Sequence, residues 1–238
     1  MGKKLFLWFD VEDYVTPESD DAFYDLLVLM DKYGIKSTIK FCTKKLRLIK
    51  ERGRTDIIKK LAQHEMAFHT INHSVHPLPT EYLEGYNFKD GAIEFDKREK
   101  EGIKEVAEIA GQYPTSYGQP GVAWAPAVFP SLVKNGIFTY LDYHPIINVD
   151  GKPFWYGGVL YLSNLKYLLH IKKDKTYGQL MKFYESIEEY EDENVFISLY
   201  DHPTELCTSE FWDEVNFSYG KNPNYLKPAP LVDKETRD

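Results

Sequence analysis

The stretch His64–His76 reads HEMAFHTINHSVH and contains four of the seven histidines in this 238-residue chain. His69 and His73 are four residues apart, a spacing that puts both imidazoles on one side of a helical turn. Neutral imidazole is the commonest side-chain ligand of a transition metal, and a catalytic zinc ion takes three protein ligands. An isolated H-x-x-x-H is about as often a loop feature as a metal site. The interpretation therefore depends on where a third ligand comes from.

Three short apolar runs each lead directly into ionisable residues: Glu65–Phe68 before His69, Leu5–Phe9 before Asp10, and Val195–Leu199 before Tyr200, Asp201 and His202. Helical patterns separate these runs, and strands that alternate with helices are typical of parallel βαβ units. In such folds the C-terminal ends of the strands gather the functional groups at one edge. The sequence therefore predicts an α/β barrel, complete or incomplete, with Asp10, His69 and His202 at one rim.

Hydrophobic periodicity and boundary residues predict the other elements. The expected helices are one that opens at Glu18 and stops at Gly34, one capped by Thr55, and three more at Asp90–Ala110, Pro126–Asn135 and Thr176–Tyr190. Further strands are expected at Ile35–Cys42, Ile137–Leu141 and Trp155–Leu162. The segment Tyr113–Pro126 is too rich in glycine and proline to be regular throughout.

The composition fits a single domain over residues 1–238, because 43% apolar residues can form a proper core. A net charge of −8 argues against nucleic-acid binding, which needs a basic face. Cys42 and Cys207 make no disulfide framework, which favours a reducing compartment. The N-terminal apolar run is too short for a signal peptide and no stretch could span a membrane. A cytoplasmic location is therefore the default expectation, with export open if the sequence is a trimmed piece.

The acidic cluster Asp10, Glu12 and Asp13 would complete a metal site if it shares a rim with His69 and His73. Two histidines and one carboxylate leave open positions on a metal, which lowers the pKa of a bound water and polarises a carbonyl. A second carboxylate can act as general base, and His202 can protonate a leaving amine. This constellation predicts hydrolysis of an amide or an ester.

Each candidate also has a structural explanation. The three acids could cap the helix that follows them, and His202, which precedes Pro203, could be a turn residue. The remaining histidines are expected to be structural: His64, His76, His144 and His170.

Four segments between about residues 5 and 205 carry further motifs: Phe9–Tyr14 (FDVEDY), Tyr33–Phe41 (YGIKSTIKF), His64–His73 (HEMAFHTINH) and Ile197–Pro203 (ISLYDHP). These segments resemble, in that order, the DVEDY variant of the first motif, the GIKATFF strand, the HEIGNHTxxH histidine motif and the last motif of the NodB-type polysaccharide deacetylases, carbohydrate esterase family 4. The resemblance implies a distorted, incomplete (β/α) barrel of about seven strands.

The activity implied by this resemblance is metal-dependent removal of an acyl group, above all acetyl, from an N-acylated sugar or polysaccharide precursor, as in surface-polysaccharide synthesis. By the same resemblance, Asp10 is the general base, His202 the general acid, and His69 and His73 are metal ligands. Zinc is the default metal, with cobalt, nickel and iron as competitors. The residues expected to contact a carbohydrate or acyl-sugar substrate are Tyr14, Gln119 and Trp124.

The third metal ligand stays open between Glu12 and Asp13. Glu12 lies on the same side as Asp10 if the strand continues, because side chains alternate along a strand. Asp13 serves instead if the chain turns after Val11.

One segment departs from the family pattern. Tyr117–Trp124 reads YGQPGVAW, with Gln119 where the family has an arginine that orients the base. Glutamine can hydrogen-bond a carboxylate but brings no charge, so the pKa of the base would be set differently. This fits a divergent subgroup that acts on nucleotide-linked or lipid-linked sugars, or on another amide.

Two other hypotheses stay open. One is an allantoinase-like hydrolase of a small non-peptide amide, and the other is a carbohydrate-binding relative that has lost turnover. The sequence does not give the sugar, the acyl group, the metal or the oligomeric state.

Overall fold

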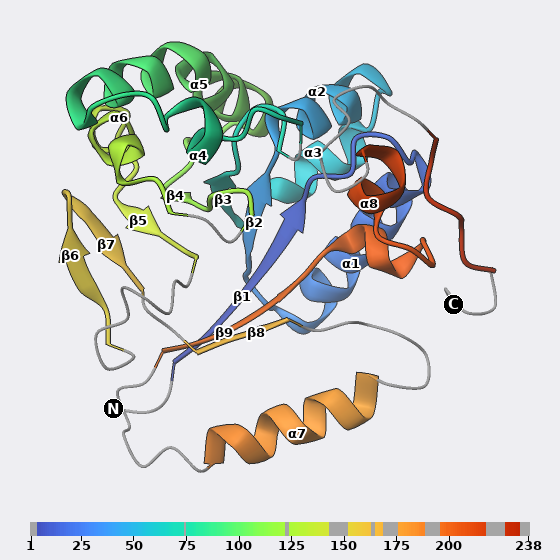
Figure 1. Ribbon diagram of the computed structural model, residues 1–238. Helices are drawn as coiled ribbons and strands as arrows, with labels where there is room; N and C mark the ends of the chain where they lie inside the picture. The colour runs from blue at the N-terminus through green and yellow to red at the C-terminus, as the bar shows by residue number, and fades with distance from the viewer. Residues whose placement is uncertain are drawn as a thin grey trace.

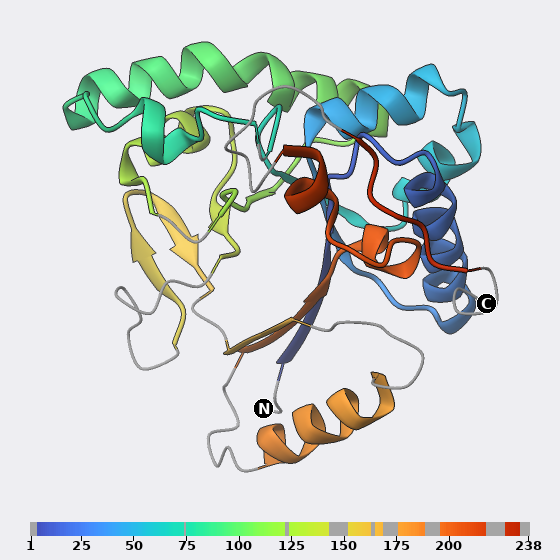
Figure 2. The ribbon, with the colours of Figure 1, turned by 45° about the vertical axis from the view of Figure 1, so that its right-hand side comes forward.

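A computed structural model of the chain describes residues 4–73, 75–121, 124–142, 152–162, 165–168, 176–188, 196–217 and 227–233. His144 and His170 lie outside these residues, as do the first residue of the strand expected at Val195–Leu199 and the last two of the helix expected at Thr176–Tyr190. Within the described ranges, the chain forms one sheet with helices packed along it (Figures 1 and 2).

The strands are β1 (Lys4–Val11), β2 (Thr38–Phe41), β3 (Glu65–Phe68), β4 (Ser116–Tyr117), β5 (Thr139–Tyr140), β6 (Phe154–Tyr156), β7 (Val159–Tyr161), β8 (Leu165–Leu168) and β9 (Phe196–Asp201). The α-helices are α1 (Glu18–Tyr33), α2 (Thr43–Glu51), α3 (Thr55–Leu61), α4 (Pro79–Tyr82), α5 (Phe88–Ala110), α6 (Phe129–Lys134), α7 (Thr176–Glu188) and α8 (Trp212–Phe217). Two 3₁₀ helices, η1 (Pro126–Val128) and η3 (Pro203–Leu206), complete the set of described elements.

The strand order is β6-β7-β5-β4-β3-β2-β1-β9-β8. Every neighbouring pair is parallel except β6 and β7, which form an antiparallel hairpin. No described pairing joins the edge strands β6 and β8, so the curled sheet stays open (Figure 2). The expected fold class, a distorted and incomplete (β/α) barrel, is confirmed.

The sheet has nine described strands where about seven were expected. The single strand expected at Trp155–Leu162 is the β6–β7 hairpin, which turns at Gly157 and Gly158, both with positive φ. A glycine tolerates this left-handed backbone without steric cost. The strands β4 and β8 were not expected from the sequence.

Side chains alternate between the two faces of β1, β2 and β3. One face is apolar and packs into the main core with α1, α2, α3 and α5: it carries Phe9, Val11, Ile39, Phe41, Met66 and Phe68. The other face carries Asp10, Lys40 and Ala67, all of them buried. The polar pair Asp10 and Lys40 therefore lies on the inner, concave side of the half-barrel, while the outer side supplies the main core.

The helix α2 was missed because its sequence, TKKLRLIKE, is strongly basic and lacks a capping side chain. Its apolar positions Leu46 and Ile49 are nevertheless fully buried. At the other end of the sheet, α7 packs on β9 through Phe183. None of the described helices combines the length and the apolar character needed to cross a bilayer.

Candidate active site

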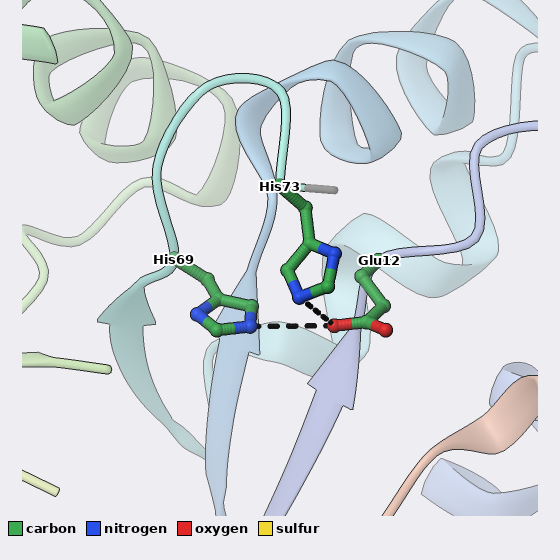
Figure 3. Close-up of side chains that lie close together, drawn as sticks. All are labelled: Glu12, His69 and His73. Atoms are coloured by element: carbon green, nitrogen blue, oxygen red, sulfur yellow. Dashed lines mark ion pairs between the residues drawn. The ribbon is translucent and has the colours of Figure 1, made fainter. Parts of the chain in front are cut away.

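Three side chains meet at the C-terminal ends of β1 and β3 (Figure 3). Glu12 directly follows β1, His69 directly follows β3, and His73 reaches the same point from the far end of a loop. The Nε2 atoms of His73 and His69 lie 2.7 Å and 3.3 Å from Glu12 Oε2. One ligand atom from each residue lies within 4.8 Å of the others. This is a compact group of two nitrogens and one oxygen.

The segment from His69 to His73 is a loop and not the helical turn that the i, i+4 spacing suggested. Thr70 and His73 have positive φ values of 62° and 42°, so the chain doubles back on itself. Backbone N–H groups at the start of α2 donate to the carbonyls of Thr70 and Ile71, at 3.1 and 3.0 Å. A helix N-terminus needs such acceptors. Hydrogen bonds from the start of α2 therefore stabilise the conformation of the His69–His73 loop.

The protonation of His69 favours a cation in this group. Its Nδ1 lies 2.7 Å from the carbonyl oxygen of Gly118, which can only accept, so Nδ1 carries the proton. Burial lowers the pKa of His69, so the neutral ring directs an unprotonated Nε2 at Glu12. Trp212 donates to the other oxygen of Glu12, Oε1, at 3.1 Å. A lone pair and a carboxylate oxygen that face each other are suited to a divalent transition metal between them.

The charge of Glu12 also suits a metal ligand. Burial by itself raises the pKa of its carboxyl group, but the neighbouring imidazoles of His73 and His69 lower it by more than burial raises it. The pKa of Glu12 is therefore held well below its ordinary value. Glu12 is a carboxylate at neutral pH even though its side chain is only 1% exposed.

Asp10 lies beside this group, between two basic side chains. Its Oδ1 is 2.9 Å from Lys40 Nζ, and its Oδ2 is 3.7 Å from His202 Nε2. His202 directly follows β9 and donates from Nδ1 to Glu205 at 3.2 Å. Burial lowers the pKa of His202, but the bond to Glu205 and the charges of Glu12 and Asp10 raise it to about 9. His202 is therefore an imidazolium at neutral pH and can give up a proton.

These groups line one cavity of about 460 Å³. Among its described lining residues are seven carboxylates: Asp10, Glu12, Asp142, Glu205, Glu210, Asp213 and Glu214. Lys40 is the only lysine or arginine among them. The cavity thus combines a metal-type ligand group, a carboxylate, an imidazolium and a strongly acidic rim.

Asp13, the other candidate for third ligand, points elsewhere. Its Oδ1 accepts the backbone N–H groups of Val15 and Thr16, both at 2.9 Å, and its Oδ2 accepts the hydroxyl of Thr204 at 2.6 Å. It is absent from the three groups of described residues that could hold a metal ion. The carboxylate of Asp13 therefore shapes the turn after β1.

The structure brings only one of the three expected substrate contacts to the cavity. Gln119 lines it, and its backbone N–H donates to Asp142 Oδ2 at 2.5 Å. Tyr14 is buried and directs its hydroxyl at the carbonyl of Asn72, 3.4 Å away. Trp124 lines a separate hollow, where its Nε1 donates to the hydroxyl of Tyr161 at 2.5 Å.

Sequence reasoning missed four residues that contact the site: Lys40, Asp142, Glu205 and Trp212. Two of them left a signal. Lys40 is a charged residue at an inward position of a strand, and a buried lysine needs an acidic partner. Asp142 directly follows the strand expected at Ile137–Leu141, as Asp10 follows Leu5–Phe9. The local patterns around Glu205 and Trp212 say nothing about Asp10 or Glu12.

A buried acid supports the loop that carries the two histidines. Glu99 on α5 accepts the backbone N–H of Ile71 at 2.8 Å, and burial raises the pKa of Glu99 to about 7. A carboxyl group with a raised pKa favours the folded state only while protonated, so its contribution to stability falls as pH rises from about 4.5 to 7. Above that range the charged group destabilises the folded protein.

We therefore expect Glu99→Gln, which keeps an acceptor for Ile71, to stabilise the protein at pH 8 by up to about 3 kcal/mol relative to wild type. At pH 5 the difference should be less than about 1 kcal/mol. Urea unfolding of both proteins at the two pH values measures it. An equal difference at both pH values would show that Glu99 does not titrate in this range.

A scan of protein-family models and a search of curated proteins each found no match. Solved structures do match. A probable polysaccharide deacetylase from Pseudomonas aeruginosa aligns with 84% of this chain and 78% of its own, at 13% identity and a TM-score of 0.59. A mutant of a Bacillus anthracis CE4 family pseudoenzyme, described as having restored enzymatic activity, aligns at 13% identity and a TM-score of 0.52. That alignment covers 85% of this chain but only 57% of the other.

A third match is a 4-α-glucanotransferase from Thermococcus litoralis, with 98% of this chain and 39% of that chain covered, at 14% identity and a TM-score of 0.58. At such low identities these likenesses show the fold alone. The resemblance to the NodB-type CE4 family is confirmed at that level. Because one fold hosts different activities, function must be argued from the site.

Proposed function

We propose that this protein is a metal-dependent hydrolase that removes an acyl group, above all acetyl, from an N-acylated sugar, as a divergent relative of the CE4 deacetylases. The observation that carries the proposal is one cavity in which Glu12, His69 and His73 converge beside Asp10 and His202. A general base, a general acid and a ligand group with open positions are the parts that amide hydrolysis requires.

A divalent metal held by Glu12, His69 and His73, with zinc as the default, would polarise the acyl carbonyl and ease the deprotonation of a water molecule. Asp10 takes the proton of the attacking water at Oδ2, since Oδ1 is bound to Lys40. His202 gives its Nε2 proton to the nitrogen of the leaving amine, and Glu205 keeps the ring oriented. These two proton transfers need Asp10 charged and His202 protonated, as found near neutral pH for His202.

The charge of the cavity lining indicates which kind of substrate the cavity can bind. Among the described lining residues, seven carboxylates stand against Lys40, which already contacts Asp10 and Asp142, and the His202 imidazolium. With a divalent metal bound, the negative charges would still outnumber the positive ones. A substrate with a diphosphate group would meet like charges there, and like-charge contacts suppress binding of a wrong partner. This argues for a neutral acylated saccharide rather than the nucleotide-linked sugar considered from the sequence.

The test is release of acetate by the purified, zinc- or cobalt-loaded protein from three compounds. These are a neutral N-acetylglucosamine oligosaccharide, a nucleoside-diphosphate-linked N-acetyl sugar, and the cyclic ureide allantoin, whose ring opening is followed separately. We expect kcat/KM for the oligosaccharide to exceed that for the diphosphate sugar by at least about tenfold, equivalent to about 1.4 kcal/mol of repulsion.

Other outcomes separate the alternatives. Hydrolysis of allantoin without any release of acetate from sugars would favour the small-amide hydrolase. Tight binding of the oligosaccharide without turnover under any metal would favour the carbohydrate-binding relative.

A further inference from the structure

Lys40 places a buried cation in the middle of β2. Its strand neighbours Ile39 and Phe41 are fully buried in the apolar core, whereas the Lys40 side chain lies on the inner face and is 2% exposed. An ammonium group in such a place is costly unless carboxylates pair with it. The contacts of Lys40 should therefore indicate why the position is a lysine.

Three groups surround the ammonium of Lys40. Asp10 Oδ1 lies 2.9 Å and Asp142 Oδ1 3.3 Å from Nζ, which also sits 4.2 Å from the ring centroid of Trp8. Asp142 is anchored in turn, because its Oδ2 accepts the backbone N–H of Gln119 at 2.5 Å. One oxygen of Asp10 is thus tied to a cation that is itself held from several sides. The other oxygen faces His202.

The surrounding backbone accommodates this arrangement. Asp10 and Lys40 are direct partners in the β1–β2 register, so both side chains start side by side. Gly118 passes so close to Lys40 that a Cβ at this position would lie 2.5 Å from Nζ and 2.8 Å from Cε. A side chain at 118 would displace the lysine, so the glycine leaves the space that Lys40 occupies.

We propose that Lys40 is a positioning residue, whose ammonium group holds Asp10 by Oδ1 so that Oδ2 stays directed into the cavity. The proposal rests on the proposed function, in which Asp10 is the general base. The positive charge beside Asp10 then comes from Lys40 on β2, and not from an arginine in the segment Tyr117–Trp124, where this chain has Gln119. Holding a reacting group in a productive geometry contributes to the rate without changing how the substrate binds.

The experiment compares Lys40→Met with Lys45→Met. Lys45 on α2 is also buried and paired, with Asp20 at 2.5 Å, but lies outside the cavity lining. We expect Lys40→Met to lower kcat about 100-fold with KM within about threefold and metal content unchanged. Lys45→Met should lower stability and leave kcat within about twofold.

A second readout separates charge from packing. In Lys40→Ala, n-propylammonium should restore kcat by at least about tenfold, and the uncharged analogue 1-propanol should not. If Lys40→Met fails to fold, the double variant Lys40→Met/Asp142→Asn takes its place. The second substitution removes one of the two carboxylates that lose their cation when Lys40 is replaced.

The proposal is overturned if Lys40→Met turns over at the wild-type rate, if both methionine variants lose kcat equally, or if 1-propanol rescues as well as the amine. If wild-type protein hydrolyses no acylated sugar, the proposed function fails. Crystal structures of wild type and Lys40→Met then test separately whether Lys40 positions Asp10. Displacement of the Asp10 carboxylate in Lys40→Met supports the positioning role, and an unmoved carboxylate refutes it.

Discussion

Asp10→Asn is expected to lower kcat by about 10³-fold while the protein keeps its metal. Asparagine has nearly the same shape as aspartate but cannot take a proton from water. Among the contacts described for this cavity, only the Asp10 carboxylate lies next to both Lys40, at 2.9 Å, and His202, at 3.7 Å. Acetate release measures the loss, and elemental mass spectrometry measures the retained metal.

The matched control for this variant is Asp20→Asn. Asp20 is equally buried and paired, with Lys45 and Arg52, but it lies away from the cavity. Its loss should reduce stability and leave kcat nearly unchanged. A metal-loaded Asp10→Asn variant with wild-type turnover would remove Asp10 from the chemistry and would require another base.

Glu12→Gln is expected to weaken metal binding at least about 100-fold and to abolish turnover at limiting metal. The amide keeps the size of the side chain and an acceptor for Trp212, but it removes the charge that His69 and His73 face. Two neutral imidazoles alone are an incomplete ligand set. Titration of the apoprotein with zinc against a chelator measures the change.

Asp13→Asn is the informative comparison, because the sequence left Glu12 and Asp13 as alternative ligands. Asp13 accepts three hydrogen bonds from Val15, Thr16 and Thr204. Its replacement should lower the free energy of unfolding by about 1 to 2 kcal/mol and leave zinc affinity unchanged. If Asp13→Asn releases the metal and Glu12→Gln does not, the ligand assignment is reversed.

The architecture and the neighbourhood of the site were predictable because they follow local rules. Apolar runs ending in Asp10, His69 and His202 indicated parallel strands whose C-terminal ends meet, and the structure places all three residues around one cavity. Alternation along a strand offered Glu12 as a partner of Asp10, with Asp13 as the alternative if the chain turned after Val11, and the structure brings Glu12 to the two histidines. The elements that escaped prediction lack such signals: β4 has two residues, and α2 is basic along most of its length.

The sequence by itself thus determined the half-barrel and the residues that could reach its rim, because strand alternation and helix periodicity are properties of short segments. Only the tertiary structure decided which partners each residue contacts there. Thr204, 191 residues away along the chain, donates a hydrogen bond to Asp13, whose carboxylate lies apart from the group of Glu12, His69 and His73. Asp142, 102 residues from Lys40, pairs with the lysine beside Asp10. Trp124, expected at the substrate, bonds Tyr161 elsewhere. Partners this remote are chosen by how the elements pack, which no local pattern records.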